Sequence, residues 1–231
     1  MGGNPLRPRE NRLGKKRRKP DWLRSEELMS TIAHSLEGIA LSRVATGENH
    51  LRISIFSETL GLQTVLFRKD RRTRANNSPD LFDEVELSLA PARSSGLRFV
   101  REHRVIAKKR ELAHDHRRFQ VASDLACLFL ENGQHLLEPK PFADLLHSAL
   151  AALCKGGNPQ VVYFKALFLF ARIEGLPVKE SWLSDLAKDE RLRAHSILNQ
   201  PVDAQNDDLS ILSVLVDSLC LWLNSETELR C

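Results

Sequence analysis

Apolar and polar side chains alternate in short stretches over residues 35–106, and turn-forming residues separate these stretches. Leu51, Ile53 and Ile55 alternate strictly with polar neighbours, and short apolar patterns also occur at 35–44, 62–67, 81–89 and 97–106. Breaks fall at 46–49, Gly61, 68–80 and 91–96. Alternation with a period of two indicates a half-buried strand. We therefore predict five short strands in this part of the chain.

From residue 108 onward, apolar residues recur at steps of three and four, which is the period of a helix. The pattern predicts helices near 112–129, 141–153, 161–173 and 209–223, with short helices at 180–187 and 189–199. Gly and Pro residues near 133, 156–159 and 175–177 separate them. No strand pattern appears after residue 107, so the second half is predicted to be all-helical.

These two patterns predict an α+β protein. Five strands with turn signals about every ten residues fit the OB fold, a small five-stranded barrel. We expect a disordered basic arm and linker at 1–34, an OB-fold domain at 35–107 and a helical domain at 108–231. No apolar run reaches the length that a membrane span needs, and a reducing cytoplasm is the expected compartment.

Residue patterns for metal binding or catalysis are absent from the sequence. The four cysteines lie at positions 127, 154, 220 and 231, with no C-x-x-C pair and no usual zinc spacing. The first three fall in apolar helical patterns and are predicted to be small buried side chains. His114 and His116 are two residues apart, so on a helix they point to different faces. With no Walker loop, G-x-S-x-G or H-E-x-x-H motif, we predict no metal, no cofactor and no enzyme activity.

The net charge of +4 is distributed unevenly along the chain. Residues 1–20 carry a net charge of +7 and residues 36–119 carry +5, whereas residues 120–231 carry −6. Because a basic region attracts polyanions and an acidic region repels them, we expect a nucleic-acid face on the N-terminal half.

Cations concentrate in the loop after the third predicted strand, and these are Arg68, Lys69, Arg71, Arg72 and Arg74. At the rim of a rigid barrel they could follow the phosphates of a nucleic acid. Arg98, Arg104, Lys108 and Lys109, on and after the fifth strand, could extend this surface. In a regular strand Arg98 and Arg104 share one side and Arg101 points to the other.

Two further features bear on nucleic-acid binding. The arm contains a run of five adjacent cations, predicted to be an auxiliary phosphate contact: Lys15, Lys16, Arg17, Arg18 and Lys19. The alternative is a solubilising tail. Phe67, Phe82 and Phe99 are the aromatic side chains near the basic loop, and we expect them to pack in the core. Scarce aromatic side chains favour contact with the phosphate backbone over base readout.

Several short motifs occur in an order that resembles the bacterial recombination mediator RecO. They are Glu37-Gly38-Ile39-Ala40-Leu41, Gly47-Glu48-Asn49-His50-Leu51, the basic loop, the stretch from Tyr163 to Phe170, and Glu174-Gly175-Leu176-Pro177. The resemblance covers about residues 36–180, and order and spacing carry it rather than any single motif. Many RecO proteins have four zinc-binding cysteines after the long helix, but residues 176–200 contain none. The resemblance therefore implies no metal here.

The resemblance implies binding of single- and double-stranded DNA and annealing of complementary strands in DNA repair and recombination after DNA damage. It also implies RecR and single-strand binding protein as partners in loading RecA, and a cytoplasmic, nucleoid-associated bacterial protein. Two alternatives remain at this stage. An OB fold serves RNA as well as DNA, and a divergent member could keep only protein contacts as an interaction scaffold.

Overall fold

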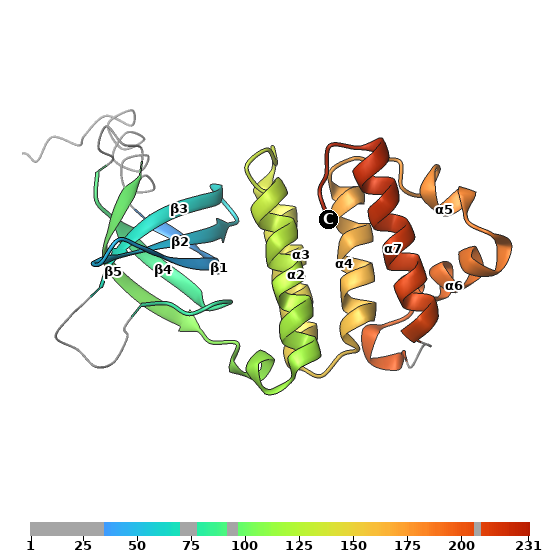
Figure 1. Cartoon of the computed structure of the whole chain (residues 1–231), viewed down its shortest axis with the longest axis horizontal. Coiled ribbons are helices and arrows are strands. Elements are labelled where there is room, and N and C mark those ends of the chain that lie inside the picture. Colours follow the sequence, from blue (N-terminus) through green and yellow to red (C-terminus); the bar gives the residue numbers. More distant parts are fainter. Residues whose placement is uncertain (1–34, 70–77, 92–96, 206–208) are drawn as a thin grey trace, which may run out of the picture. The chain divides into compact units, whose positions relative to one another are not determined.

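We describe a computed structural model of the chain, which covers residues 35–69, 78–91, 97–205 and 209–231. Five strands come first: β1 (Ser35–Thr46), β2 (His50–Ser57), β3 (Gly61–Arg68), β4 (Glu84–Leu89) and β5 (Arg98–Ala107). They form a closed barrel in the order β1-β2-β3-β5-β4, with β3 and β5 parallel and the other pairs antiparallel. The predicted OB-fold-like barrel is therefore confirmed (Figure 1).

The helical half follows in the order η1 (Arg110–His114), α2 (His116–Asn132), α3 (Pro139–Cys154), α4 (Pro159–Ile173), α5 (Trp182–Asp185), α6 (Lys188–Asn199), η2 (Val202–Ala204) and α7 (Leu209–Glu226). No strand occurs among the described residues after Ala107, so the predicted α+β class is confirmed. Local signals explain where two of the helices begin. Asp115 accepts hydrogen bonds from the backbone amides of Arg117 and Arg118, and Asn158 caps α4 immediately before Pro159.

The barrel closes because β1 is long and bent. Its first residues, Ser35–Ile39, pair with β4, and its later residues pair with β2, with a register shift between Ala40 and Ser42. Gly38 lies where the strands approach closely, since a Cβ atom there would lie 2.2 Å from the carbonyl oxygen of Phe56. No larger residue fits this position without moving the backbone.

The fourth strand begins later than its sequence pattern predicts. Alternation suggests a strand from Leu81, but β4 begins at Glu84. Phe82 has a positive φ of 66°, which is uncommon for a bulky residue and interrupts the extended chain. Backbone hydrogen bonds hold this conformation, from the amide of Phe82 to the carbonyl of Ala40 and from the amide of Ala40 to the carbonyl of Asp83.

Two hydrophobic cores fill the molecule. The barrel interior holds side chains such as Ile53, Ile55 and Val85, all fully buried. The second core lies among the helices and also takes in Ile39, Leu41, Phe56 and Phe82 from the barrel strands. By its contacts the chain from residue 34 onward forms one compact unit. The predicted boundary at 107 coincides with the end of β5, and the division into an OB-fold domain and a helical domain stays a prediction.

A row of phenyl rings connects the barrel to the helices. Phe56 on β2 meets Phe129 on α2 edge to face, with ring centroids 4.8 Å apart. Phe129 in turn contacts Phe170 on α4 at 5.2 Å, and Phe170 contacts Phe142 on α3 at 4.8 Å. Edge-to-face pairs contribute stabilisation beyond the area that they bury. These four rings therefore tie three helices to one strand.

The cysteines differ in part from expectation. Cys127 is exposed, although its apolar surroundings in the sequence predict burial, and Cys154 and Cys220 are half-buried. Cys127 lies on α2 between buried Ala126 and Leu128, and the helical turn places it on the opposite side of the apolar stripe.

We expect Phe129→Ala to destabilise the protein by about 3–5 kcal/mol, because it removes a fully buried ring that packs between Phe56 and Phe170 and leaves a cavity. Urea unfolding measures this change. Leu137→Ala is the control, since Leu137 is 97% exposed and its loss should cost less than about 0.5 kcal/mol. Equal effects of the two substitutions would show that the row of rings does not stabilise the packing of the helices on the barrel.

Candidate nucleic-acid interface

The predicted basic loop follows β3, and its first two cations fall within the described residues. Arg68 is the last residue of β3 and is exposed, and Lys69 is half-buried. The backbone amide of Lys69 donates to the carbonyl of Asn49, 2.7 Å away, so the loop starts beside the β1–β2 turn. The other predicted cations of the loop and those of the arm lie outside the described residues: Arg71, Arg72, Arg74, Lys15, Lys16, Arg17, Arg18 and Lys19.

Two other predicted cations lie on a different side of the barrel and have carboxylate partners. Arg104 on β5 pairs with Glu86 on β4, with its Nη2 and Nε atoms 2.6 and 3.0 Å from one carboxylate oxygen. The ammonium of Lys109 lies 4.0 Å from a carboxylate oxygen of Glu84. Their charges are therefore partly compensated within the protein.

Arg98 and Arg104 do not share one side of β5, contrary to the expectation for a regular strand. The register along β4 shifts between Ser88, which pairs with Glu102, and Leu89, which pairs with Val100. This bulge leaves Arg101 unpaired and reverses the alternation beyond it. Arg98 is half-buried beside Val65 of β3, whereas Lys108 is exposed after the end of β5.

The outer surface of β1, β2 and β3 is divided into a covered part and an open part. Phe56 pairs with Leu62, and Gly133 of the helical half lies directly over both. A Cβ atom at Gly133 would lie 3.2 Å from the Phe56 ring and 3.3 Å from the Leu62 Cβ. Farther along the same strands no such cover exists among the described residues, and the outward side chains are exposed or half-buried.

The open part has two rows of outward side chains, which we call the outer strip. Cross-strand pairing places them side by side, and they are Val44, Arg52, Leu66 and Phe99 in one row and Thr46, His50 and Arg68 in the next. The rows are outward because their neighbours along β2, Leu51 and Ile53, are buried in the barrel. The strip thus combines two cations with apolar surface.

An aromatic pair lies at the edge of the strip. The ring of Phe99 contacts the imidazole of His50 at a centroid distance of 5.6 Å, and both are half-buried. Phe67 and Phe82 are 4% and 3% exposed, as their predicted core packing requires. Phe99 differs from them, because it pairs with outward Leu66 and keeps part of its ring accessible.

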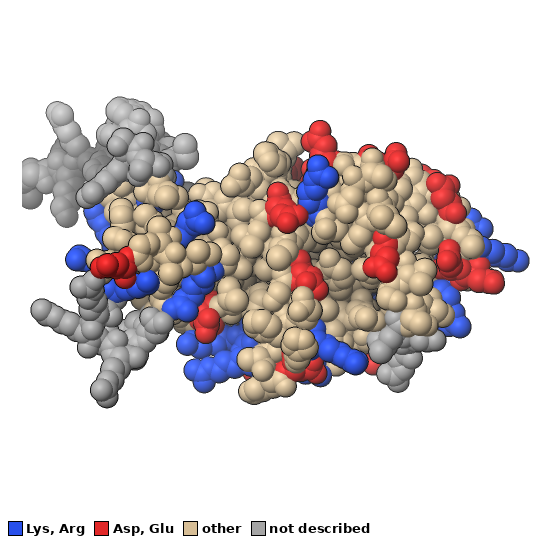
Figure 2. Space-filling view, in the orientation of Figure 1, with Lys and Arg blue, Asp and Glu red and all other residues tan. Residues whose placement is uncertain are grey.

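Charge differs between the two sides of the barrel. The side chains of the strip include Arg52 and Arg68 and no carboxylate, and one exposed carboxylate, Glu48, lies in the turn between Thr46 and His50. The outward positions of β4 and its neighbours include three, Glu37, Glu84 and Glu86. In Figure 2, Lys and Arg side chains gather around the barrel and the residues after β5, and Asp and Glu side chains are spread over the helices. A polyanion would therefore meet least repulsion at the strip.

Sequence reasoning did not select Arg52 or His50. The signal was present, because alternation with buried Leu51 and Ile53 places Arg52 on the outside. A single arginine in a strand does not stand out beside a loop with five cations. Pairing across three strands brings Arg52 and Arg68 into neighbouring rows, and this pairing is a property of the fold.

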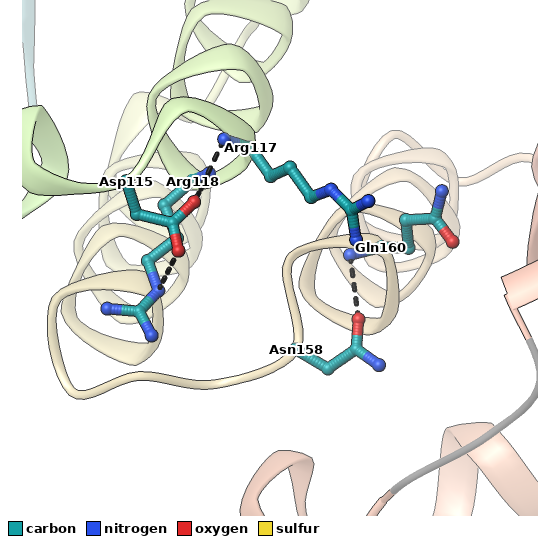
Figure 3. Close-up of polar contacts among 5 residues, drawn as sticks. All are labelled: Asp115, Arg117, Arg118, Asn158 and Gln160. Atoms are coloured by element: carbon teal, nitrogen blue, oxygen red, sulfur yellow. Dashed lines mark hydrogen bonds and ion pairs between the residues drawn. The ribbon is translucent and has the colours of Figure 1, made fainter.

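A cavity of about 930 Å³ lies in the helical half. It is bordered by the starts of α2 and α4 and by α7, and Figure 3 shows Arg117 extending from α2 toward the start of α4. Asp115, beside the cavity, accepts amide hydrogen bonds from Arg118 and Arg117, which lower the pKa of its carboxyl group. Burial raises the pKa of the Tyr163 hydroxyl on the cavity wall. The hydrogen bonds drawn there are helix caps and present no nucleophile beside a base.

The chain matches no model of a known protein family, and it matches no curated protein.

Within the described ranges, no three His, Cys, Asp or Glu side chains are grouped so that they could hold a metal ion, and His114 and His116 belong to no such group. Among the same residues, no helix is both long and apolar enough to cross a membrane.

We expect the charge reversals Arg52→Glu and Arg104→Glu to change the free energy of unfolding by no more than about 1 kcal/mol each. Both side chains are exposed, and an exposed ion pair such as Arg104–Glu86 contributes little. Urea unfolding of both variants checks this. A loss of several kcal/mol would mean that the side chain has a structural role.

Proposed function

We propose that this chain is a non-catalytic DNA-binding protein of the RecO type, which binds single- and double-stranded DNA and anneals complementary strands in repair and recombination. The observation that carries the proposal is the outer strip, a face of an OB-fold-like barrel that no other described residue covers and whose side chains include Arg52 and Arg68 and no carboxylate. The order of sequence motifs supports the same assignment. RecR and single-strand binding protein are the partners that the resemblance suggests, and the bacterial nucleoid is the expected location.

In the proposed complex, a single strand lies across β2 and β3. Arg52 and Arg68 contact its phosphates, and Leu66 and Phe99 offer apolar surface to its bases. The rest of the basic loop follows Arg68 in the chain, and its residues Arg71, Arg72 and Arg74 supply further phosphate contacts. Arg104 and Lys109 are not part of this surface, since they face Glu86 and Glu84.

Annealing follows from the same electrostatics. Two complementary strands repel each other through their phosphates, and cations on a protein surface reduce this repulsion. In this complex the arginines contact phosphates and the apolar side chains contact the faces of the bases, so the base edges stay free. A strand held there can pair with another strand without prior release.

The first experiment measures the affinity for a labelled single-stranded oligonucleotide over a salt series, with the full chain and a chain that lacks residues 1–20. Each phosphate contact contributes about −0.7 to the slope of log K against log salt. We expect the double substitution Arg52→Gln and Arg68→Gln to weaken binding and to make the slope less steep by about 1.4. Arg104→Gln is the matched control and should leave the slope unchanged.

Three outcomes distinguish the alternatives. If binding is lost with the arm and is insensitive to Arg52 and Arg68, the barrel is not the DNA site and an interaction scaffold becomes the better assignment. If RNA of the same sequence binds much more tightly than DNA, the protein is an RNA-binding module. If Arg104→Gln weakens binding as much as the double substitution, the strip has no special role.

A second prediction concerns strand annealing. We expect the full chain to accelerate the pairing of two complementary single strands, and the Arg52→Gln and Arg68→Gln double variant to lose most of this acceleration. Fluorescence of a donor and an acceptor on the two strands follows the reaction. A double variant that binds weakly but anneals at the full rate would refute the electrostatic mechanism.

A further inference from the structure

A second cavity lies between α4, α5 and α6, far along the chain from the barrel strands. It measures about 410 Å³, which is within the usual range for small-molecule sites. Its lining differs in character from the rest of the helical half. Residues 120–231 carry a net charge of −6, yet the cavity lining contains cations and no carboxylate.

Five basic side chains surround this cavity, and they come from α4, from α6 and from the turn between α4 and α5. They are Lys165, Arg172, Lys179, Arg191 and His195. None of them has a carboxylate partner within the described part of the chain. Cations brought together without compensation repel one another, so the arrangement favours a bound anion.

Two of the cations are held in place by backbone carbonyl groups. The ammonium of Lys165 donates to the carbonyl of Gln200, and Arg191 Nη1 donates to the carbonyl of Ser184 at 3.0 Å. Each side chain keeps further N–H donors for a ligand. Burial lowers the pKa of Lys165, which is the direction that a neighbouring anion would reverse.

The floor of the cavity is apolar. Phe168 and Leu183 are 2% and 3% exposed, and Leu169 and Leu198 contribute more accessible surface. Phe168 also packs against Trp182, with ring centroids 6.3 Å apart, so its position is fixed by the core. A ligand that fits must therefore combine an apolar part with concentrated negative charge.

We propose that the cavity between α4, α5 and α6 binds a nucleotide, with the base on the apolar floor and the phosphate among the surrounding cations. A phosphate group carries up to two negative charges on one centre, whereas the carboxylates of a peptide are single charges spread along a chain. Five basic groups around about 410 Å³ match the concentrated charge better. The nucleotide is either free or one unit of a nucleic-acid strand, and both share this chemistry.

The full chain is titrated at low salt with adenosine 5′-monophosphate and, separately, with adenosine. Calorimetry measures the affinity for each. We expect the monophosphate to bind at least about tenfold more tightly than adenosine, because a single charge-assisted hydrogen bond to the phosphate already changes the affinity by about tenfold or more. The double variant Arg172→Glu and Lys179→Glu should lose at least about tenfold in affinity. Both residues are exposed, so the fold should tolerate the change.

The matched control is the double variant Lys188→Glu and Arg193→Glu. It makes the same change in net charge on exposed positions of α6 that do not line the cavity, and it should retain the affinity. An equal loss in both double variants would overturn the proposal, since it would indicate attraction by net charge alone. Absence of binding at millimolar monophosphate, or tighter cavity-dependent binding of an acidic peptide, would overturn it as well.

The source of the nucleotide is tested in a chain that carries Arg52→Glu and Arg68→Glu. A short single-stranded oligonucleotide that displaces the monophosphate from this variant assigns the cavity to a strand, and failure to displace it assigns the cavity to a free nucleotide. Because the barrel substitutions do not touch the helical cavity, the monophosphate result stands whether or not the barrel strip binds DNA.

Discussion

The ring of Phe56 points out of the barrel and meets the edge of Phe129 at 4.8 Å. This contact places α2 and Gly133 over the outer side of β2 and β3 at one end, where Leu62 is also covered. The other end of the same strands remains open, so Arg52 is exposed there. The contact between this strand and the helices therefore also determines which part of the barrel surface is available to a ligand.

Charge follows the same division of the barrel. The open strip has arginines without carboxylates, whereas the β4 side pairs Arg104 with Glu86. An arginine near a carboxylate contributes less to polyanion binding, because part of its field is already compensated. The distribution of carboxylates, more than the number of cations, thus distinguishes the two faces. In the helical half as well, the cavity between α4, α5 and α6 is lined by basic side chains and by no carboxylate.

Sequence patterns identified the five strands, the order of strands before helices and the breaks between helices. They were less successful in locating the ends of strands and in assigning side chains to one face of a strand. β4 begins at Glu84 because Phe82 adopts a positive φ, which no propensity for phenylalanine suggests. The bulge at Arg101 separates Arg98 from Arg104 and depends on how β5 pairs with β4. A bulge arises between two strands, so one strand's sequence does not reveal it.

Local order along the chain came from the amino-acid sequence, because the periods of two and 3.6 reflect backbone geometry within a few residues. The fold class and the basic character of the first half could be predicted in this way, from residues close together in the chain. The neighbouring positions of Arg52 and Arg68, and the gathering of cations from α4 and α6 around one cavity, are different. They join residues far apart in the chain, and such proximity exists only once the strands have paired and the helices have packed.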